Sequence, residues 1–171
     1  VEVTPAIATV LLSAIMTDTV ITKSPTCTDY DLVQAEKLGA IIGKKPTEFG
    51  LEVFKMRGGD NDLSVEELCT HDSKEFKKGD DVYMVAQHET VTLDVAMERE
   101  AEYREFLRQK VAENGYKFAL LLVTDIFNEG SKFICEGDVA PVSEAFGIDA
   151  TKAEWVDGIL SRKKQVIPPL S

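Results

Sequence analysis

The sequence predicts an α/β protein: a mixed β-sheet with helices packed on it, preceded by a mainly helical region. Three observations support this prediction. From residue 63 onward, segments of helical periodicity are interleaved with short apolar runs. The run at 118–123, Phe-Ala-Leu-Leu-Leu-Val, is apolar throughout, which is typical of a central strand covered on both faces. A Lys-Lys-Gly-Asp turn at 77–80 separates strand-like segments at 74–76 and 82–91 and predicts a hairpin.

The helical region is expected to span residues 1–57. Thr4 followed by Pro5 is typical of a helix start, and the near-continuous apolarity of 6–16 predicts a helix buried on most sides. An extended stretch is expected at 20–22. A second helix should start at a capping box formed by Thr28 and Asp31 and run to Gly43, and a third should cover 47–57.

The glycine- and Asx-rich segment around residues 58–62 predicts an interdomain linker because it has nothing to bury. The second domain is then expected at 63–171. Because the sequence starts with Val1 and enters an apolar helix almost at once, we expect it to be a fragment of a longer protein.

The second domain carries clear helix signals. Ser64 and Glu67 form a capping box, and residues 94–114 predict one long amphipathic helix that Gly115 ends, with a favourable Glu100–Arg104 pair. The remaining expected elements are a strand at 132–135, a helix at 142–146, a helix capped by Thr151 and Glu154, and a strand at 165–167.

Composition narrows the possible partners and compartment. The formal net charge of −11 argues against nucleic acid or an anionic membrane as the main partner. The three cysteines lack a Cys-x-x-Cys spacing, so we expect reduced thiols in a cytoplasmic protein rather than disulfides or a structural zinc site. The apolar run at 6–16 is too short to cross a bilayer and lacks the basic start of a signal peptide.

Four places carry candidate chemistry. Arg162-Lys163-Lys164 is a local cluster of cations in an acidic chain, suited to phosphate oxygens, although a solvated surface run is the alternative. Lys74 is either a second phosphate contact or an ordinary hairpin lysine. Asp18, after the first apolar helix, is either a ligand for a hard cation or a loop residue with local hydrogen bonds. Asp125 follows the central strand and has either a functional or a turn role.

Taken together, these segments resemble a known family. The stretch 11–19, Leu-Leu-Ser-Ala-Ile-Met-Thr-Asp-Thr, and the stretch 23–29, Lys-Ser-Pro-Thr-Cys-Thr-Asp, are similar to family II inorganic pyrophosphatases of the DHH phosphoesterase superfamily. Asp-Ser-Lys-Glu-Phe at 72–76 and Leu-Leu-Val-Thr-Asp-Ile at 121–126 match in the same order. The tail Ser-Arg-Lys-Lys-Gln at 161–165 is the most specific part of the resemblance.

The resemblance implies a residue-by-residue assignment. Asp18 would be a metal ligand, whereas Lys74, Arg162 and Lys163 would contact pyrophosphate, and Lys164 is assigned no direct contact. Residues 1–57 would be the end of the metal-binding DHH domain, and 63–171 the DHH-associated, substrate-binding domain. The parent enzyme would use Mn²⁺ (or Co²⁺) and Mg²⁺, hydrolyse pyrophosphate and form a homodimer.

The sequence departs from the family by lacking the Asp-His-His motif and the other metal ligands. One aspartate cannot hold two divalent ions. We therefore expect no tightly bound metal and no hydrolysis in this chain alone, with the missing DHH domain as its partner. A related exopolyphosphatase and a non-catalytic phosphate-binding or regulatory module are the alternative functions.

Overall fold

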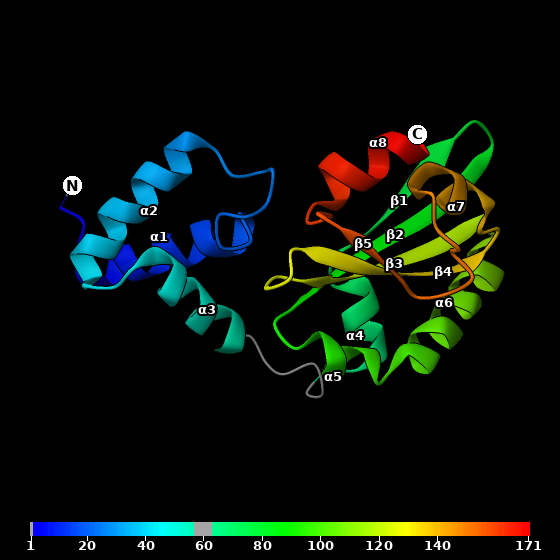
Figure 1. Cartoon of the computed structure of the whole chain (residues 1–171), viewed down its shortest axis with the longest axis horizontal. Coiled ribbons are helices and arrows are strands. Elements are labelled where there is room, and N and C mark those ends of the chain that lie inside the picture. Colours follow the sequence, from blue (N-terminus) through cyan, green and yellow to red (C-terminus); the bar gives the residue numbers. More distant parts are fainter. Residues whose placement is uncertain (1, 57–62) are drawn as a thin grey trace. The chain divides into compact units, whose positions relative to one another are not determined.

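The computed structural model describes residues 2–56 and 63–171. The chain divides into two compact units, Val1–Gly59 and Asp60–Ser171, coloured blue to cyan and green to red in Figure 1. The linker predicted at 58–62 lies outside the described residues. Each unit is described by itself below.

The described part of the first unit is built from helices α1 (Pro5–Asp18), α2 (Asp29–Ile42) and α3 (Pro46–Met56). The predicted starts of α1 and α2 and the predicted end of α2 are confirmed: Thr4 accepts a hydrogen bond from the third residue of its helix, Thr28 and Asp31 form a capping box, and Gly43 is left-handed.

Helix α1 is buried along only one stripe. Ala8, Leu12 and Met16 are fully buried, whereas Val10 on another face is 69% exposed. The prediction that α1 is buried on most sides is therefore wrong for the described unit, because its two neighbouring helices cover one side only.

Residues Val20–Thr22 form a left-handed turn, so the predicted extended stretch is wrong. Their φ angles are +49°, +53° and +65°. The Thr19 hydroxyl donates to the Ile15 carbonyl at 2.6 Å and accepts from the Thr22 N–H at 3.0 Å, and the Ile21 N–H donates to the Met16 carbonyl at 2.8 Å. These bonds curl the chain back over the end of α1. The turn costs about 1–2 kcal/mol per left-handed residue, and burial of the Val20 and Ile21 side chains offsets that cost.

The second unit contains a five-stranded sheet in the order β1-β2-β3-β4-β5. Strands β2 and β3 are parallel, and the other neighbouring pairs are antiparallel. The mixed sheet and the predicted hairpin of β1 and β2 are thereby confirmed. The strands are β1 (Ser73–Lys78), β2 (Asp81–Thr90), β3 (Phe118–Asp125), β4 (Gly130–Gly137) and β5 (Glu154–Asp157).

Helices cover both faces of this sheet (Figure 1). One face, called the α6 face, packs on α4 (Val65–Thr70), α5 (Leu93–Met97) and α6 (Glu100–Asn114). The opposite face, called the α8 face, packs on α7 (Ala140–Phe146), a π-helical turn η1 (Arg162–Val166) and α8 (Ile167–Leu170). Strand β3 is buried along its whole length between the two layers, as its apolar run predicts.

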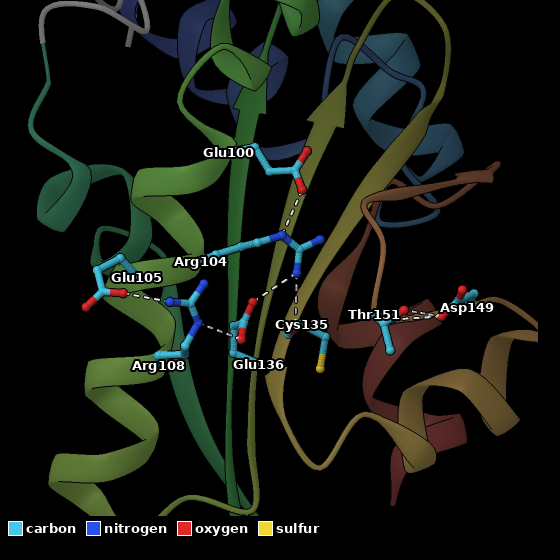
Figure 2. Close-up of polar contacts among 8 residues, drawn as sticks. All are labelled: Glu100, Arg104, Glu105, Arg108, Cys135, Glu136, Asp149 and Thr151. Carbon is cyan, nitrogen blue, oxygen red and sulfur yellow. Dashed lines mark hydrogen bonds and ion pairs between the residues drawn. The ribbon is translucent and has the colours of Figure 1, made fainter.

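The Arg104 side chain clamps α6 onto the sheet (Figure 2). Its Nε donates to Glu100 at 2.7 Å, which confirms the predicted pair within the helix. Its Nη1 donates to Glu136 of β4 at 2.9 Å, and Arg108 donates to the same carboxylate at 3.1 Å. Because the Arg104 side chain is only 14% exposed, these paired charges are screened less than a surface ion pair.

The single helix predicted at 94–114 is wrong, because the chain breaks into α5 and α6 at Glu98 and Arg99. The Arg99 guanidinium donates to the Leu63 carbonyl at 2.7 Å, which holds the bend in place. The break lets Ala96 and Tyr103 both become fully buried on the α6 face. Helical periodicity alone does not reveal such a bend.

The helix predicted from Thr151 and Glu154 is also wrong. Asp149 closes a turn by accepting from the Thr151 N–H at 3.2 Å, and β5 follows (Figure 2). The Lys152 ammonium and the Thr151 hydroxyl and N–H hold the pKa of Asp149 down at about 2. The chain is extended at β5 because Trp155 packs directly over Gly130, where any side chain would overlap its ring.

The strand predicted at 165–167 is replaced by η1 and the start of α8. Pro168 and Pro169 follow Ile167 in the first turn of α8, where a missing N–H costs nothing. The N–H groups of Gln165 and Ile167 donate to the carbonyls of Ser161 and Arg162 in the π-helical turn, so they are not available to a strand ladder. Within the described ranges, no helix is both long enough and apolar enough to cross a membrane.

Candidate anion-binding site

The cationic tail, residues 161–165, follows a turn that the Gln165 side chain closes. The Gln165 side-chain oxygen accepts from the N–H groups of Leu160 and Ser161, both at 2.9 Å, and its amide nitrogen donates to the Gly158 carbonyl at 2.7 Å. The Ser161 hydroxyl accepts from the Lys164 N–H at 3.4 Å. The tail pattern therefore builds a defined turn on the α8 face rather than an unstructured charge run.

Arg162 begins η1 and points into the protein. It is 7% exposed, and its guanidinium reaches the entry to β1. Nη2 donates to the Asp72 carboxylate at 2.6 Å, and Nη1 donates to the carbonyl oxygens of Asp72 and, at 3.3 Å, of Val85. A guanidinium has five N–H donors. Three of them are used in these contacts, which leaves Nε and one hydrogen of Nη2 outside them.

Lys74 emerges from β1 on the same face of the sheet as the tail. It lies opposite Val85 in the antiparallel ladder, and directly opposed side chains point to one face. Val85 belongs to the core beneath η1, and its carbonyl is also the acceptor for Arg162. The structure therefore brings Lys74 and Arg162 to the same end of the α8 face.

Lys163 follows Arg162 in the first turn of η1 and is exposed, as is Lys74. The two exposed lysines thus belong to β1 and η1, the segments that the buried Arg162 guanidinium joins through Asp72. Both side-chain types suit an oxyanion with several charges, because Lys offers mobile point charges and Arg offers a rigid, planar donor edge.

Asp18 is the last residue of α1 in the first unit and is exposed. Its carbonyl accepts from the Thr26 hydroxyl at 3.1 Å, and the left-handed turn follows directly. In the portions of the chain that the structure describes, no group of three or more His, Cys, Asp or Glu side chains could hold a metal ion. The residues present therefore do not fit a two-metal centre.

Asp125 has the turn role rather than a place in this site. Its carboxylate accepts from the N–H groups of Phe127 and Asn128 at 2.8 and 3.0 Å, and from the Asn128 side chain at 2.7 Å. These three bonds close the turn between β3 and β4.

Comparison with known proteins shows the family to which the chain belongs. A model of the DHHA2 domain matches residues 51–171. The chain belongs to the DHHA2 domain family. This match includes Lys74, Arg162 and Lys163, so the candidate anion site lies within the DHHA2 domain.

Named relatives resemble the whole chain. A manganese-dependent inorganic pyrophosphatase of Methanocaldococcus jannaschii is 35% identical over 171 residues. A Staphylococcus haemolyticus protein named "Probable manganese-dependent inorganic pyrophosphatase" is 37% identical over 172 residues. Each alignment covers 99% of this chain and 56% of the relative, so the chain spans just over half the length of these proteins.

A solved structure is similar to the same extent. The crystal structure of a protein provisionally described as a family II inorganic pyrophosphatase, from Methanococcus jannaschii, matches with a TM-score of 0.87 and 35% identity. The match covers 99% of this chain and 56% of that protein. The resemblance to family II inorganic pyrophosphatases expected from the tail and the Asp18 segment is confirmed.

Sequence reasoning missed two polar partners of the tail in the DHHA2 domain, Asp72 and Gln87. Asp72 stood beside Lys74 in the matched segment but carried no expected role. Gln87 did leave a signal, because it is an amide within an otherwise apolar strand and is only 7% exposed. A polar side chain at an inward-facing strand position requires a partner, and the sequence does not name that partner.

Proposed function

We propose that this chain is the substrate-gripping, C-terminal part of a manganese-dependent inorganic pyrophosphatase that converts pyrophosphate to two phosphates. The observation that carries the proposal is the placement of Lys74, Arg162 and Lys163 at one end of the α8 face. The names of the relatives, manganese-dependent inorganic pyrophosphatases, support the choice of pyrophosphate.

The role of these residues follows from their charges. Pyrophosphate carries several negative charges, and its phosphoryl oxygens gain charge as the bridging bond breaks. Lys74 and Lys163 would neutralise these oxygens, and the remaining donor edge of Arg162 would orient one phosphoryl group. Arg162 contributes fewer donors than a free guanidinium, because Asp72 and Val85 hold the others.

Hydrolysis would need more than this chain. The described residues do not fit a metal pair, so the activation of water is assigned to the rest of the metal-binding DHH domain, of which residues 1–57 would be the end. Asp18 would complete that domain's site as one ligand among several. The chain by itself should bind pyrophosphate without hydrolysing it.

The exposed stripe of α1 supports a partner domain. Ile7, Val10 and Leu11 are 44%, 69% and 45% exposed, and they follow one another at helical spacing. We assign this stripe to contact with the rest of the metal-binding DHH domain. Val10→Asp should reduce concentration-dependent self-association of the isolated chain in sedimentation velocity, since it places a charge in the stripe. Unchanged association would contradict this assignment.

The three cysteines are unpaired thiols, and Cys69 and Cys135 are buried. We place the protein in the cytoplasm, because a reducing compartment keeps such thiols free.

The test is a calorimetric titration of pyrophosphate into the chain. Lys74→Ala and Lys163→Ala should each weaken binding by about tenfold or more, because one contact to a charged group is worth about 1.5–3 kcal/mol. Inorganic phosphate should bind more weakly than pyrophosphate, since it can engage fewer of the cations at once.

Two control variants distinguish the loss of a specific contact with pyrophosphate from the general effect of removing one positive charge. Lys77 lies on the same strand as Lys74 but alternates to the opposite face, and Lys164 follows Lys163 directly. Lys77→Ala and Lys164→Ala should leave the affinity within about twofold of the unmodified chain, as expected for screened surface charges. Equal losses in all four variants would refute a site and leave only a general electrostatic effect.

A further inference from the structure

A buried polar chain crosses the sheet on the α8 face. It starts at Gln87 in β2, continues through Thr124 in β3 and ends at Ser131 in β4. The Gln87 amide nitrogen donates to the Thr124 hydroxyl at 3.0 Å, and the Thr124 and Ser131 hydroxyls lie 2.7 Å apart. Ser131 in turn donates to the Ile159 carbonyl at 2.8 Å, so this chain ends on the segment that leads into the cationic tail.

Gln87 joins the sheet directly to the tail. Its amide nitrogen also donates to the Leu160 carbonyl at 3.2 Å, and its side-chain oxygen accepts from the Arg162 N–H at 3.0 Å. The partners determine which way the amide points, because a carbonyl can only accept and a backbone N–H can only donate. Both amide hydrogens and the amide oxygen are therefore used.

The backbone N–H of Gln87 and the Arg162 side chain also share one acceptor, the Asp72 carbonyl. The Gln87 N–H donates to the Asp72 carbonyl at 2.9 Å, and that carbonyl also accepts from Arg162 Nη1. The main chain of Arg162 is thus held by the Gln87 side chain, and its guanidinium by Asp72. These contacts set the position of the residue from which Lys163 extends.

We propose that Gln87 is a positioning residue for the pyrophosphate site, holding the Arg162–Lys163 backbone in register with Lys74. The inference rests on the proposed function, in which these cations bind pyrophosphate. Gln87 itself points into the protein and touches no ligand in this scheme. It acts by holding the tail at a fixed position relative to Lys74, so that the cations do not move independently of one another.

Gln87→Met tests this role, because the Met and Gln side chains have similar lengths. The main change is therefore the loss of the polar amide group. The Arg162 N–H loses its acceptor while the Gln165 bonds to Leu160 and Ser161 remain. Amide exchange measured by NMR should then be at least about tenfold faster at Arg162, since a buried N–H without a partner is exposed by local opening. The Gly158 N–H, bonded to the Glu129 carbonyl at 2.8 Å, should exchange at an unchanged rate.

Pyrophosphate affinity is the second measurement. Gln87→Met should weaken binding by about tenfold, comparable to the loss of one positioned cation. Ile134→Val is the control for reduced stability: Ile134 is fully buried in the core of the α6 face, away from the tail. This variant should keep the unmodified affinity. Unfolding midpoints of both variants establish that each is folded under the conditions of the titration.

The outcomes separate the two proposals. Faster exchange at Arg162 together with weaker binding in Gln87→Met alone supports the positioning role. If Lys74→Ala loses affinity while Gln87→Met does not, the positioning role is overturned and the pyrophosphate site stands. Equal losses in Gln87→Met and Ile134→Val would also overturn it. If Lys74→Ala has no effect, the proposed function fails and this inference fails with it.

Discussion

Arg162 has a structural role that can be measured apart from ligand binding. Its guanidinium joins η1 to the start of β1 through Asp72 and to β2 through the Val85 carbonyl. Arg162→Met removes these contacts and keeps most of the aliphatic volume of the side chain. Lys163→Met removes the same charge from the next residue, which is exposed.

The expected loss follows from the contacts. Two bonds to backbone carbonyls contribute about 1 kcal/mol each. The ion pair to Asp72 adds about 1 kcal/mol, the upper part of the surface range, because the Asp72 side chain is 52% exposed and solvent screens it. Arg162→Met should therefore lower the free energy of unfolding by about 3 kcal/mol, whereas Lys163→Met should change it by less than about 0.5 kcal/mol.

Urea denaturation followed by tryptophan fluorescence provides the assay. The chain has one tryptophan, Trp155 in β5, so the signal reports on the second unit. At an m value of about 1.5 kcal/mol/M, Arg162→Met should shift the midpoint down by about 2 M. A loss below about 1 kcal/mol, or an equal loss in Lys163→Met, would refute the view that the guanidinium ties the tail to the sheet.

Two further predictions concern stability and thiol chemistry. Gly137→Ala should destabilise the protein by about 2 kcal/mol or more, because φ is +96° and a Cβ would lie 2.6 Å from a backbone carbonyl oxygen. Gly147→Ala, with positive φ but open space, should cost about 1 kcal/mol in the same denaturation assay. At pH 8, iodoacetamide should modify Cys27 first and reach Cys69 and Cys135 only in urea, because burial raises the pKa of both buried thiols to about 12. The folded-state pKa values of these two thiols exceed the ordinary value of about 9, so their protonated forms should contribute fully to stability below pH 9, and that contribution should be lost as the pH rises toward 12. Mass spectrometry measures the modification of each cysteine, and urea unfolding midpoints at pH 8 and 10.5 measure the loss of stability.

Local signals in the sequence predicted many elements correctly. Helices α2 and α4 start at the capping boxes of Thr28 and Ser64, and α6 ends at Gly115, as expected. The apolar run of β3 and the turn of the β1–β2 hairpin are also where the sequence places them. Each of these signals acts between residues a few positions apart, so no knowledge of distant partners is needed.

Two of the errors occur where contacts with residues outside a segment overrule its own conformational preference. Val20–Thr22 has the β-branched composition of a strand, yet hydrogen bonds to the end of α1 curl it into a left-handed turn. Residues 154–157 follow a helix-like cap, yet Trp155 packs over Gly130 and makes them an edge strand. In both places, burial and pairing with other elements outweigh local propensities, which amount to only about 1 kcal/mol per residue.

The sequence by itself determined the family resemblance, the mixed α/β fold and the cations at Lys74, Arg162 and Lys163. Only the tertiary structure decided that Arg162 is largely committed to the protein while the two lysines are exposed. The physical reason is sequence separation: Arg162 meets Asp72 and Gln87 across 90 and 75 residues, respectively. Hydrogen-bond partners so far apart are chosen by the folding of the sheet and by the need to satisfy buried polar groups.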